Sequence, residues 1–193
     1  MSQPVAVSVR KRTATRDRIA VAAAELVAAQ GLAATTVERI AERAQIGRAT
    51  FFRYFSSKED AVADGISRQW LGHITAAIAR QDPELSAHQA VVAAFADLGD
   101  GFGQISDQVR ELAILTRSSP ALSAWTLQLY LSYETAIAEL VAPRLKAGPE
   151  DPRPRLIGAL AMASLRLALD DWLVHGGSLP DRVRIALSAL SVH

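Results

Sequence analysis

The chain has 193 residues, of which 50% are hydrophobic, no cysteine, and a formal net charge of +1. This length suits one or two small domains that can bury a core. The lack of cysteine excludes a disulfide framework, a thiolate nucleophile and a Cys-ligated zinc. Because no apolar run is long enough for a signal peptide or a membrane span, we expect a cytoplasmic protein.

Positive charge is concentrated in the first third of the chain. Residues 1–60 carry ten Lys or Arg and six Asp or Glu, whereas residues 61–193 carry eleven and fourteen. This asymmetry favours a module that meets a polyanion, joined to a module that does not. A chance imbalance of surface charges is the alternative.

Apolar residues recur with a period of about 3.6 almost throughout the chain, which predicts an all-α fold. We expect a first helix from about Ala14 to Gln30, ended by Gly31. Two short helices over 36–43 and 47–54 follow, and a capping box at Ser57 and Asp60 begins a long helix over 58–81. The later helices are expected at about 86–103, 107–118, 120–145, 155–175 and 180–192.

The segment "IGRATFFRYFSSKED", residues 46–60, combines aromatic and basic side chains. Two short helices joined by a three-residue turn and braced by a first helix make a helix-turn-helix. Phe51 and Phe55 are four residues apart, so they share a face that we assign to the core. Arg48 and Phe52 share a different face, which suits contact with DNA grooves and phosphates. A platform for single-stranded bases is the weaker reading, because such platforms usually lie on sheets.

The longer stretch "TTVERIAERAQIGRATFFRYFSSKEDAV", residues 35–62, resembles the DNA-binding domain of the TetR family of bacterial transcriptional regulators. The family pattern is met by Thr36, Ile40, Ala41, Thr50, Phe52, Tyr54, Phe55 and Lys58. The chain departs from it at three positions: Gln45 replaces a usual turn Gly, Gly47 replaces a usual helix cap, and Phe52 replaces a common Tyr. The resemblance covers about residues 14–62, and the rest agrees in length and helical character.

We expect three parts: a flexible basic arm over 1–13, a helix-turn-helix DNA-binding domain over 14–60, and a helical ligand-binding and dimerisation domain over 61–193. The resemblance also implies DNA contacts. Arg48 and Phe52 would face bases, and the phosphate contacts would come from Thr36, Thr50, Tyr54 and Lys58, with Gly47 and Arg53 beside them. Thr36 as a pure cap and Tyr54 as a packing residue are the alternatives. The basic run from Arg10 to Arg16 adds DNA contacts or is only a solubilising tail.

Segment 156–175 is apolar nearly all round, so a helix there is buried on more than one side. Together with 180–192 it predicts a four-helix dimer interface across a two-fold axis, as the resemblance also implies. A chain that packs well as a monomer is the alternative. Within 156–175 we expect Arg166 and Asp170 to form an ion pair one helical turn apart.

Large or amphipathic side chains lie on the segments that would surround a cavity. Each is singly more often a core residue than a ligand contact, but together they suggest an apolar site for a hydrophobic or acyl-type effector. These candidates are Trp70, His73, Phe95, Phe102, Trp125, Tyr133 and Trp172, with Tyr130 beside them.

An enzyme is the competing class. The histidines at 73, 88, 175 and 193 are too scattered for a metal motif, and no nucleophile elbow, P-loop or zinc-protease motif occurs. We therefore expect no catalysis, no metal and no cofactor. The sequence favours a sequence-specific DNA-binding regulator, a ligand-relieved repressor that binds a palindromic operator as a homodimer. A helical ligand-binding or scaffold protein is the alternative, and an all-helical enzyme is the least favoured.

Overall fold

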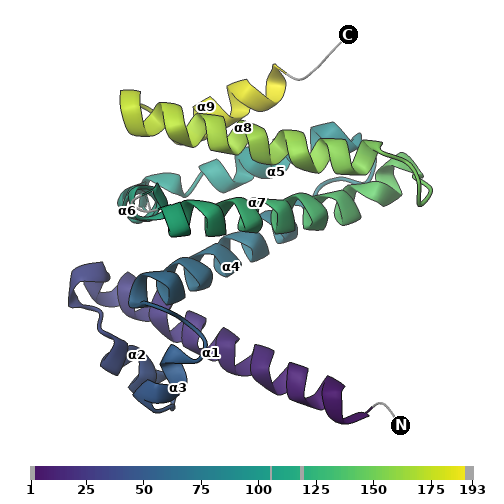
Figure 1. The fold of residues 1–193 in the computed structure, drawn as a ribbon. Helices are drawn as coiled ribbons and strands as arrows, with labels where there is room; N and C mark the ends of the chain where they lie inside the picture. Colours follow the sequence, from purple (N-terminus) through teal and green to yellow (C-terminus); the bar gives the residue numbers. More distant parts are fainter. Residues whose placement is uncertain (1–2, 105, 118–119, 190–193) are drawn as a thin grey trace. The chain divides into compact units, whose positions relative to one another are not determined.

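The computed structural model describes residues 3–104, 106–117 and 120–189, and every regular element in these ranges is a helix (Figure 1). The all-α prediction is therefore confirmed. The elements are α1 (Gln3–Ala34), α2 (Val37–Arg43), α3 (Arg48–Phe52), α4 (Lys58–Ala79), α5 (Ala87–Gly99), η1 (Phe102–Gln104), α6 (Ser106–Arg117), α7 (Pro120–Val141), η2 (Ala142–Leu145), α8 (Arg153–His175) and α9 (Leu179–Ser188).

The chain divides into two compact units, Met1–Trp70 and Leu71–His193, called unit 1 and unit 2 below. The division falls inside α4, whereas the sequence suggested a boundary at the start of that helix. The predicted domain limits stay a prediction. No helix in the described ranges combines the length and the apolar content needed to cross a bilayer.

Helix α1 begins earlier than predicted. It begins at Gln3 rather than near Ala14, so residues 3–13 form helix where an arm was expected. The physical reason is the lack of glycine and proline between Val5 and Thr13, which leaves nothing to break the helix. At the other end Gly31 has a positive φ of 78° and a non-helical backbone, so the long helix ends there as predicted, and only a short helical turn follows to Ala34.

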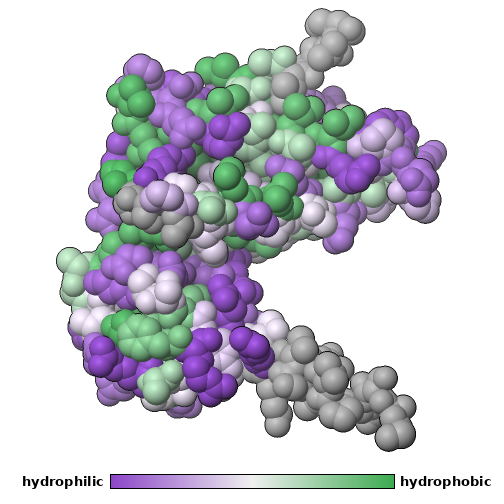
Figure 2. Space-filling view, viewed as in Figure 1, coloured by the Kyte–Doolittle hydropathy of each residue, from purple (hydrophilic) through white to green (hydrophobic). Residues whose placement is uncertain are grey.

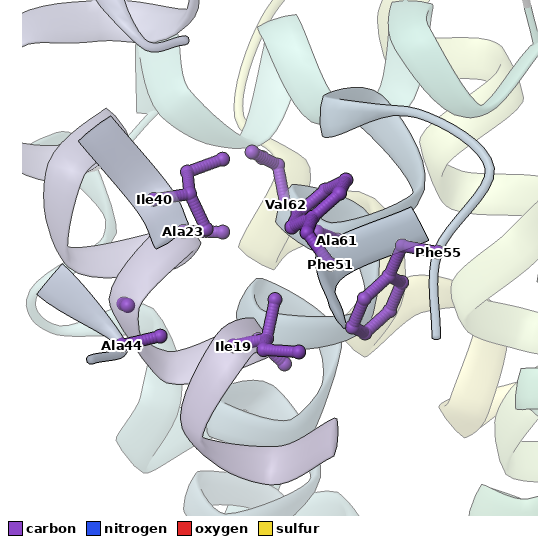
Figure 3. Packing of buried hydrophobic residues seen from close by; sticks show 10 residues of the cluster. Ile19, Ala23, Ile40, Ala44, Phe51, Phe55, Ala61 and Val62 are labelled. Atoms are coloured by element: carbon purple, nitrogen blue, oxygen red, sulfur yellow. The ribbon is translucent and has the colours of Figure 1, made fainter. Parts of the chain in front are cut away.

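The core of unit 1 gathers side chains from α1, α2, α3 and α4 (Figure 3). Ile19, Ile40 and Phe51 are fully buried, and Phe55 is 4% exposed. The assignment of Phe51 and Phe55 to the core is confirmed, with their ring centroids 5.9 Å apart. This core fixes which face of the short helix α3 points to solvent.

Helices α1 and α4 approach closely at Gly65. A Cβ built on this glycine would lie 2.0 Å from the carbonyl oxygen of Ala20, far inside a van der Waals contact. Only a residue without a side chain permits this backbone contact. Gly158 plays the same part in unit 2, where a Cβ would lie 2.3 Å from the Glu134 carbonyl oxygen of α7.

Unit 2 packs α7 against α8, and α8 and α5 against α9. Its fully buried side chains include Val91, Ile137, Val141, Met162 and Leu187. The predicted helices of unit 2 are present, but α5 stops at Gly99 before the separate turn η1, η2 follows α7, and α9 ends at Ser188. The predicted extensions to 118 and over 190–192 lie outside the described residues. Pro143 lies in η2, where its missing N–H prevents a regular α-helix from continuing.

Candidate DNA-binding site

The turn between α2 and α3 is set by local hydrogen bonds. Thr36 caps α2, since its side-chain oxygen accepts the Arg39 backbone N–H at 3.3 Å. After α2, Gln45 adopts a left-handed φ of 54°, and the Ile46 N–H donates to the Ala41 carbonyl at 2.9 Å. Gln45 therefore takes up the conformation for which the family usually uses glycine. The turn therefore keeps its backbone hydrogen bond, although Gln45 is held in a strained left-handed conformation.

Helix α3 has one buried face and one exposed face. Phe51 is fully buried, whereas the neighbouring Phe52 is 47% exposed and meets the Phe51 ring edge-on at 5.4 Å. The Arg48 guanidinium carbon lies 5.4 Å from the Phe52 ring centroid. Arg48 Nε also lies 3.1 Å from Oε1 of Glu38 on α2. The predicted base-facing pair is thus brought together on the solvent side, with an acidic neighbour that sequence reasoning missed.

The other predicted DNA contacts flank this pair. Gly47 precedes α3 without any side-chain cap, as expected from its lack of a side chain, and it is exposed. Thr50 and Tyr54 are half-buried, and Arg53 is exposed at the end of the helix. An exposed helix start leaves backbone N–H groups available to an anion. The DNA roles of these residues stay predictions.

Lys58 lies at the start of α4 and ties that helix to the end of α1. Its ammonium donates to the carbonyl oxygens of Leu32 at 3.0 Å and Thr35 at 2.8 Å. The Asp60 N–H donates to Ser57 Oγ at 3.1 Å, which is one half of the predicted capping box, whereas the Asp60 carboxylate accepts a hydrogen bond from Ser56 Oγ. Because an ammonium has three N–H donors, one remains for a phosphate.

A groove of about 830 Å³ lies between α1 and α2 in unit 1. None of the predicted effector-binding residues lines it. Its lining is mixed in charge on both helices: α1 contributes Asp17, Arg18 and Glu25, and α2 contributes Arg39, Glu42 and Arg43, around Val21, Ala22, Leu26, Ala44 and Gln45. Arg43 and Glu25 pair across it at 2.7 Å.

The predicted effector-binding residues are spread over α4 to α8. Phe95, Tyr133 and Trp172 are buried, Trp70, Phe102 and Trp125 are half-buried, and His73 is exposed. The structure brings Phe102 and Trp172 into edge-on contact at 5.7 Å. It also places the Arg110 guanidinium carbon 4.2 Å from the Trp172 ring centroid, a contact that no sequence pattern indicates. Trp172 Nε1–H donates to the Gly177 carbonyl oxygen at 3.0 Å.

A polar cluster joins α6, α7 and α8. Arg117 Nη2 lies 2.6 Å from Asp170 Oδ1, so the predicted pairing of Asp170 with Arg166 is wrong. Tyr130 lies beside this pair, and burial raises the pKa of its phenol while Arg117 acts in the opposite direction. In the described part of the chain, no group of three or more His, Cys, Asp or Glu side chains is placed to hold a metal ion.

These features define a class of protein. Two short helices joined by a tight turn rest on a core formed with α1 and α4, and the second short helix exposes a basic and aromatic face. This is a helix-turn-helix DNA-binding domain followed by a second helical unit. Residues 19–63 match the model for bacterial regulatory proteins of the TetR family, and residues 85–192 match the MftR C-terminal domain. The chain belongs to the TetR family and is a DNA-binding transcriptional regulator.

Two relatives support this assignment. The transcriptional regulator TcmR of Streptomyces glaucescens is 32% identical over 189 residues, which cover 95% of this chain and 80% of TcmR. MftR of Mycobacterium tuberculosis, named as a transcriptional regulator of mycofactocin biosynthesis, is 29% identical over 166 residues, covering 85% of this chain and 82% of MftR.

Two solved structures share the fold. A TetR regulator from Rhodococcus sp. RHA1 has a TM-score of 0.67 at 18% identity and covers 95% of this chain and 98% of its own. The repressor FadR of Thermus thermophilus, in complex with lauroyl-CoA, has a TM-score of 0.65 at 23% identity and covers 92% of this chain and 96% of its own.

Proposed function

We propose that this regulator is a cytoplasmic repressor that binds a palindromic operator as a homodimer and leaves it when an apolar effector binds. The observation that carries the proposal is the exposed pair of Arg48 and Phe52 on α3, held outward by the buried Phe51. Arg48 suits bidentate contact with guanine, and Phe52 suits apolar contact with a thymine methyl. The phosphate contacts are assigned to Thr36, Gly47, Thr50, Arg53, Tyr54 and Lys58.

Support for a homodimer comes from the surface of α8. Leu156, Leu160, Leu167 and Val174 are 55%, 42%, 54% and 75% exposed. On a helix of 3.6 residues per turn they fall within about 40° of one another. Figure 2 shows patches of hydrophobic surface among hydrophilic surface on unit 2. Exposed apolar side chains aligned on one face of a helix favour association, and Ile185 of α9 is also 61% exposed.

The effector site is assigned to the helices that carry the predicted aromatic residues, with Phe102 and Trp172 already in contact. Trp70, His73, Phe95, Trp125 and Tyr133 complete the proposed set. FadR of Thermus thermophilus has the same fold and binds lauroyl-CoA, which supports an acyl-type effector for this chain. The protein needs no cofactor for this role and carries out no catalysis.

The test is a footprint of the purified protein on the DNA upstream of its own gene, followed by titration with lauroyl-CoA and with free coenzyme A as the control. We expect a symmetric footprint that lauroyl-CoA weakens and coenzyme A does not. Linkage requires operator DNA to weaken lauroyl-CoA binding by the same factor. Tight lauroyl-CoA binding that is unchanged by operator would contradict the inducer role. Light scattering that shows only a monomer at micromolar concentration would contradict the dimer.

A further inference from the structure

Arg16 of α1 connects two other elements within unit 1. Its Nη2 lies 3.3 Å from Asp64 Oδ1 on α4, and its Nη1 donates to the Tyr54 carbonyl oxygen at 3.5 Å. Its guanidinium carbon also lies 4.6 Å from the centroid of the Phe55 ring. Because Tyr54 and Phe55 lie just beyond α3, one side chain bridges the end of that helix and α4.

Asp64 carries a second ion pair that does not reach α3. Its side chain is 10% exposed, and Oδ2 accepts a hydrogen bond from Arg68 Nε at 2.9 Å. Arg68 Nη1 lies 2.9 Å from Asp17 Oδ1 on α1, an ion pair that lacks hydrogen-bond geometry at that oxygen. The ion pairs of Arg68 therefore link α4 to α1 alone, whereas the contacts of Arg16 also reach the end of α3. A buried carboxylate needs such cationic partners, since one left unpaired is costly.

Helix α3 depends on its surroundings for its orientation. It has five residues, far fewer than a helix needs to be stable alone. Phe51 and Phe55 anchor α3 by packing into the core on one side. These two contacts alone leave the helix free to tilt about them. The Arg16 hydrogen bond to the Tyr54 carbonyl restrains this movement at the end of the helix.

We propose that Arg16 is a positioning residue for DNA reading: held by Asp64, it fixes the end of α3 relative to α4 and so sets the orientation of Arg48 and Phe52. This role rests on the proposed reading function of α3. Since α4 continues without a break from Lys58 to Ala79, a shift of Asp64 would pass through Arg16 to the reading helix. The rival explanation is that Arg16, 37% exposed and in a basic segment, contacts a phosphate directly.

Three variants separate these explanations. Arg16→Lys keeps a cation near Asp64 but loses the planar fork that spans two acceptors. Asp64→Asn removes the negative charge that pairs with Arg16 and leaves every cation in place. Arg68→Ala is the matched control, because it disturbs the contact of α1 with α4 but spares the link from Asp64 through Arg16 to Tyr54.

We expect Arg16→Lys and Asp64→Asn each to lower operator affinity by about tenfold, and Arg68→Ala to change it by less than about threefold. In all three variants, the slope of log affinity against log salt concentration should equal that of the wild type. A direct phosphate contact predicts instead that Asp64→Asn binds as tightly as the wild type or more tightly, which would overturn the positioning role. Affinity losses in all three variants that merely follow their thermal midpoints would overturn it too.

A second measurement needs no operator and so stands even if the proposed function fails. Hydrogen–deuterium exchange of the free protein is followed in peptides covering 46–56. We expect faster exchange in Arg16→Lys and Asp64→Asn than in the wild type, and no change in Arg68→Ala. Exchange that is unchanged in both of the first two variants shows that Arg16 does not hold α3. A wild-type protein that selects no DNA motif would instead refute the proposed function.

Discussion

Arg48 and Glu38 pair across the turn of the helix-turn-helix, with Arg48 Nε 3.1 Å from Glu38 Oε1 and the two side chains 68% and 64% exposed. An ion pair this exposed stabilises a fold by about 0–1 kcal/mol. Arg48 can therefore exchange Glu38 for a guanine at little cost. The carboxylate of Glu38, in contrast, remains beside the surface that we propose meets DNA.

Glu38→Gln should bind every duplex more tightly than the wild type by a few fold, because it removes a negative charge near the phosphates. Fluorescence anisotropy with operator and with scrambled duplex at several salt concentrations measures this change. The selected motif should stay the same. A loss of operator affinity would mean that Glu38 holds Arg48 in its reading position.

Arg48→Ala should relax the preference at one base pair of each half-site, at a cost of about 1–3 kcal/mol per contact. Selection from random duplex DNA, run side by side with the wild type, reads out this preference position by position. If both proteins return the same motif with the same information content, Arg48 does not read a base.

Lys58→Ala should weaken binding to all sequences alike and lower the salt slope by about one per subunit. The structure adds a second effect, since the variant loses two hydrogen bonds to the carbonyls of Leu32 and Thr35. A lower thermal midpoint is thus expected, and binding should be measured well below it. An unchanged salt slope together with a lower midpoint would assign Lys58 to the fold alone.

The predictable parts of the fold are those with local causes. The cap at Thr36, the turn at Gln45 and the buried pair of Phe51 and Phe55 involve residues within a few positions of one another, so spacing and residue type suffice. The early start of α1 was missed because a basic run without Gly or Pro is compatible with both a flexible arm and a helix.

Contacts between distant parts of the chain could not be predicted. Arg16 and Asp64 are 48 residues apart, and Arg117 and Asp170 are 53 apart. Arg166 lies one helical turn from Asp170, so the spacing suggested that pair. In the structure Asp170 pairs instead with Arg117 of α6. For the same reason the sequence predicted which side chains of α3 are exposed, but not the contact of Arg16 with the Tyr54 carbonyl beyond the end of that helix.

The two glycines of α4 allow a matched test of its packing on α1. Gly65→Ala should destabilise the protein by about 1–3 kcal/mol or more, because the new methyl group meets the Ala20 carbonyl at 2.0 Å. Gly72→Ala, in the same helix with no atom within 4 Å of the added Cβ, should stabilise it by about 0.5–1 kcal/mol. Urea denaturation of both variants measures the difference. Equal effects would show that α1 and α4 do not approach closely at Gly65.

Selection by the wild-type protein from random duplex DNA tests whether the exposed face of α3 reads DNA sequence. A homodimer with two reading helices predicts an enriched motif of two inverted half-sites, with centres about one helical turn, roughly 34 Å, or slightly more apart. Binding to this motif should exceed binding to scrambled duplex by about 10³-fold or more at physiological salt. If no motif is enriched and all duplexes bind with equal affinity, α3 does not read DNA sequence.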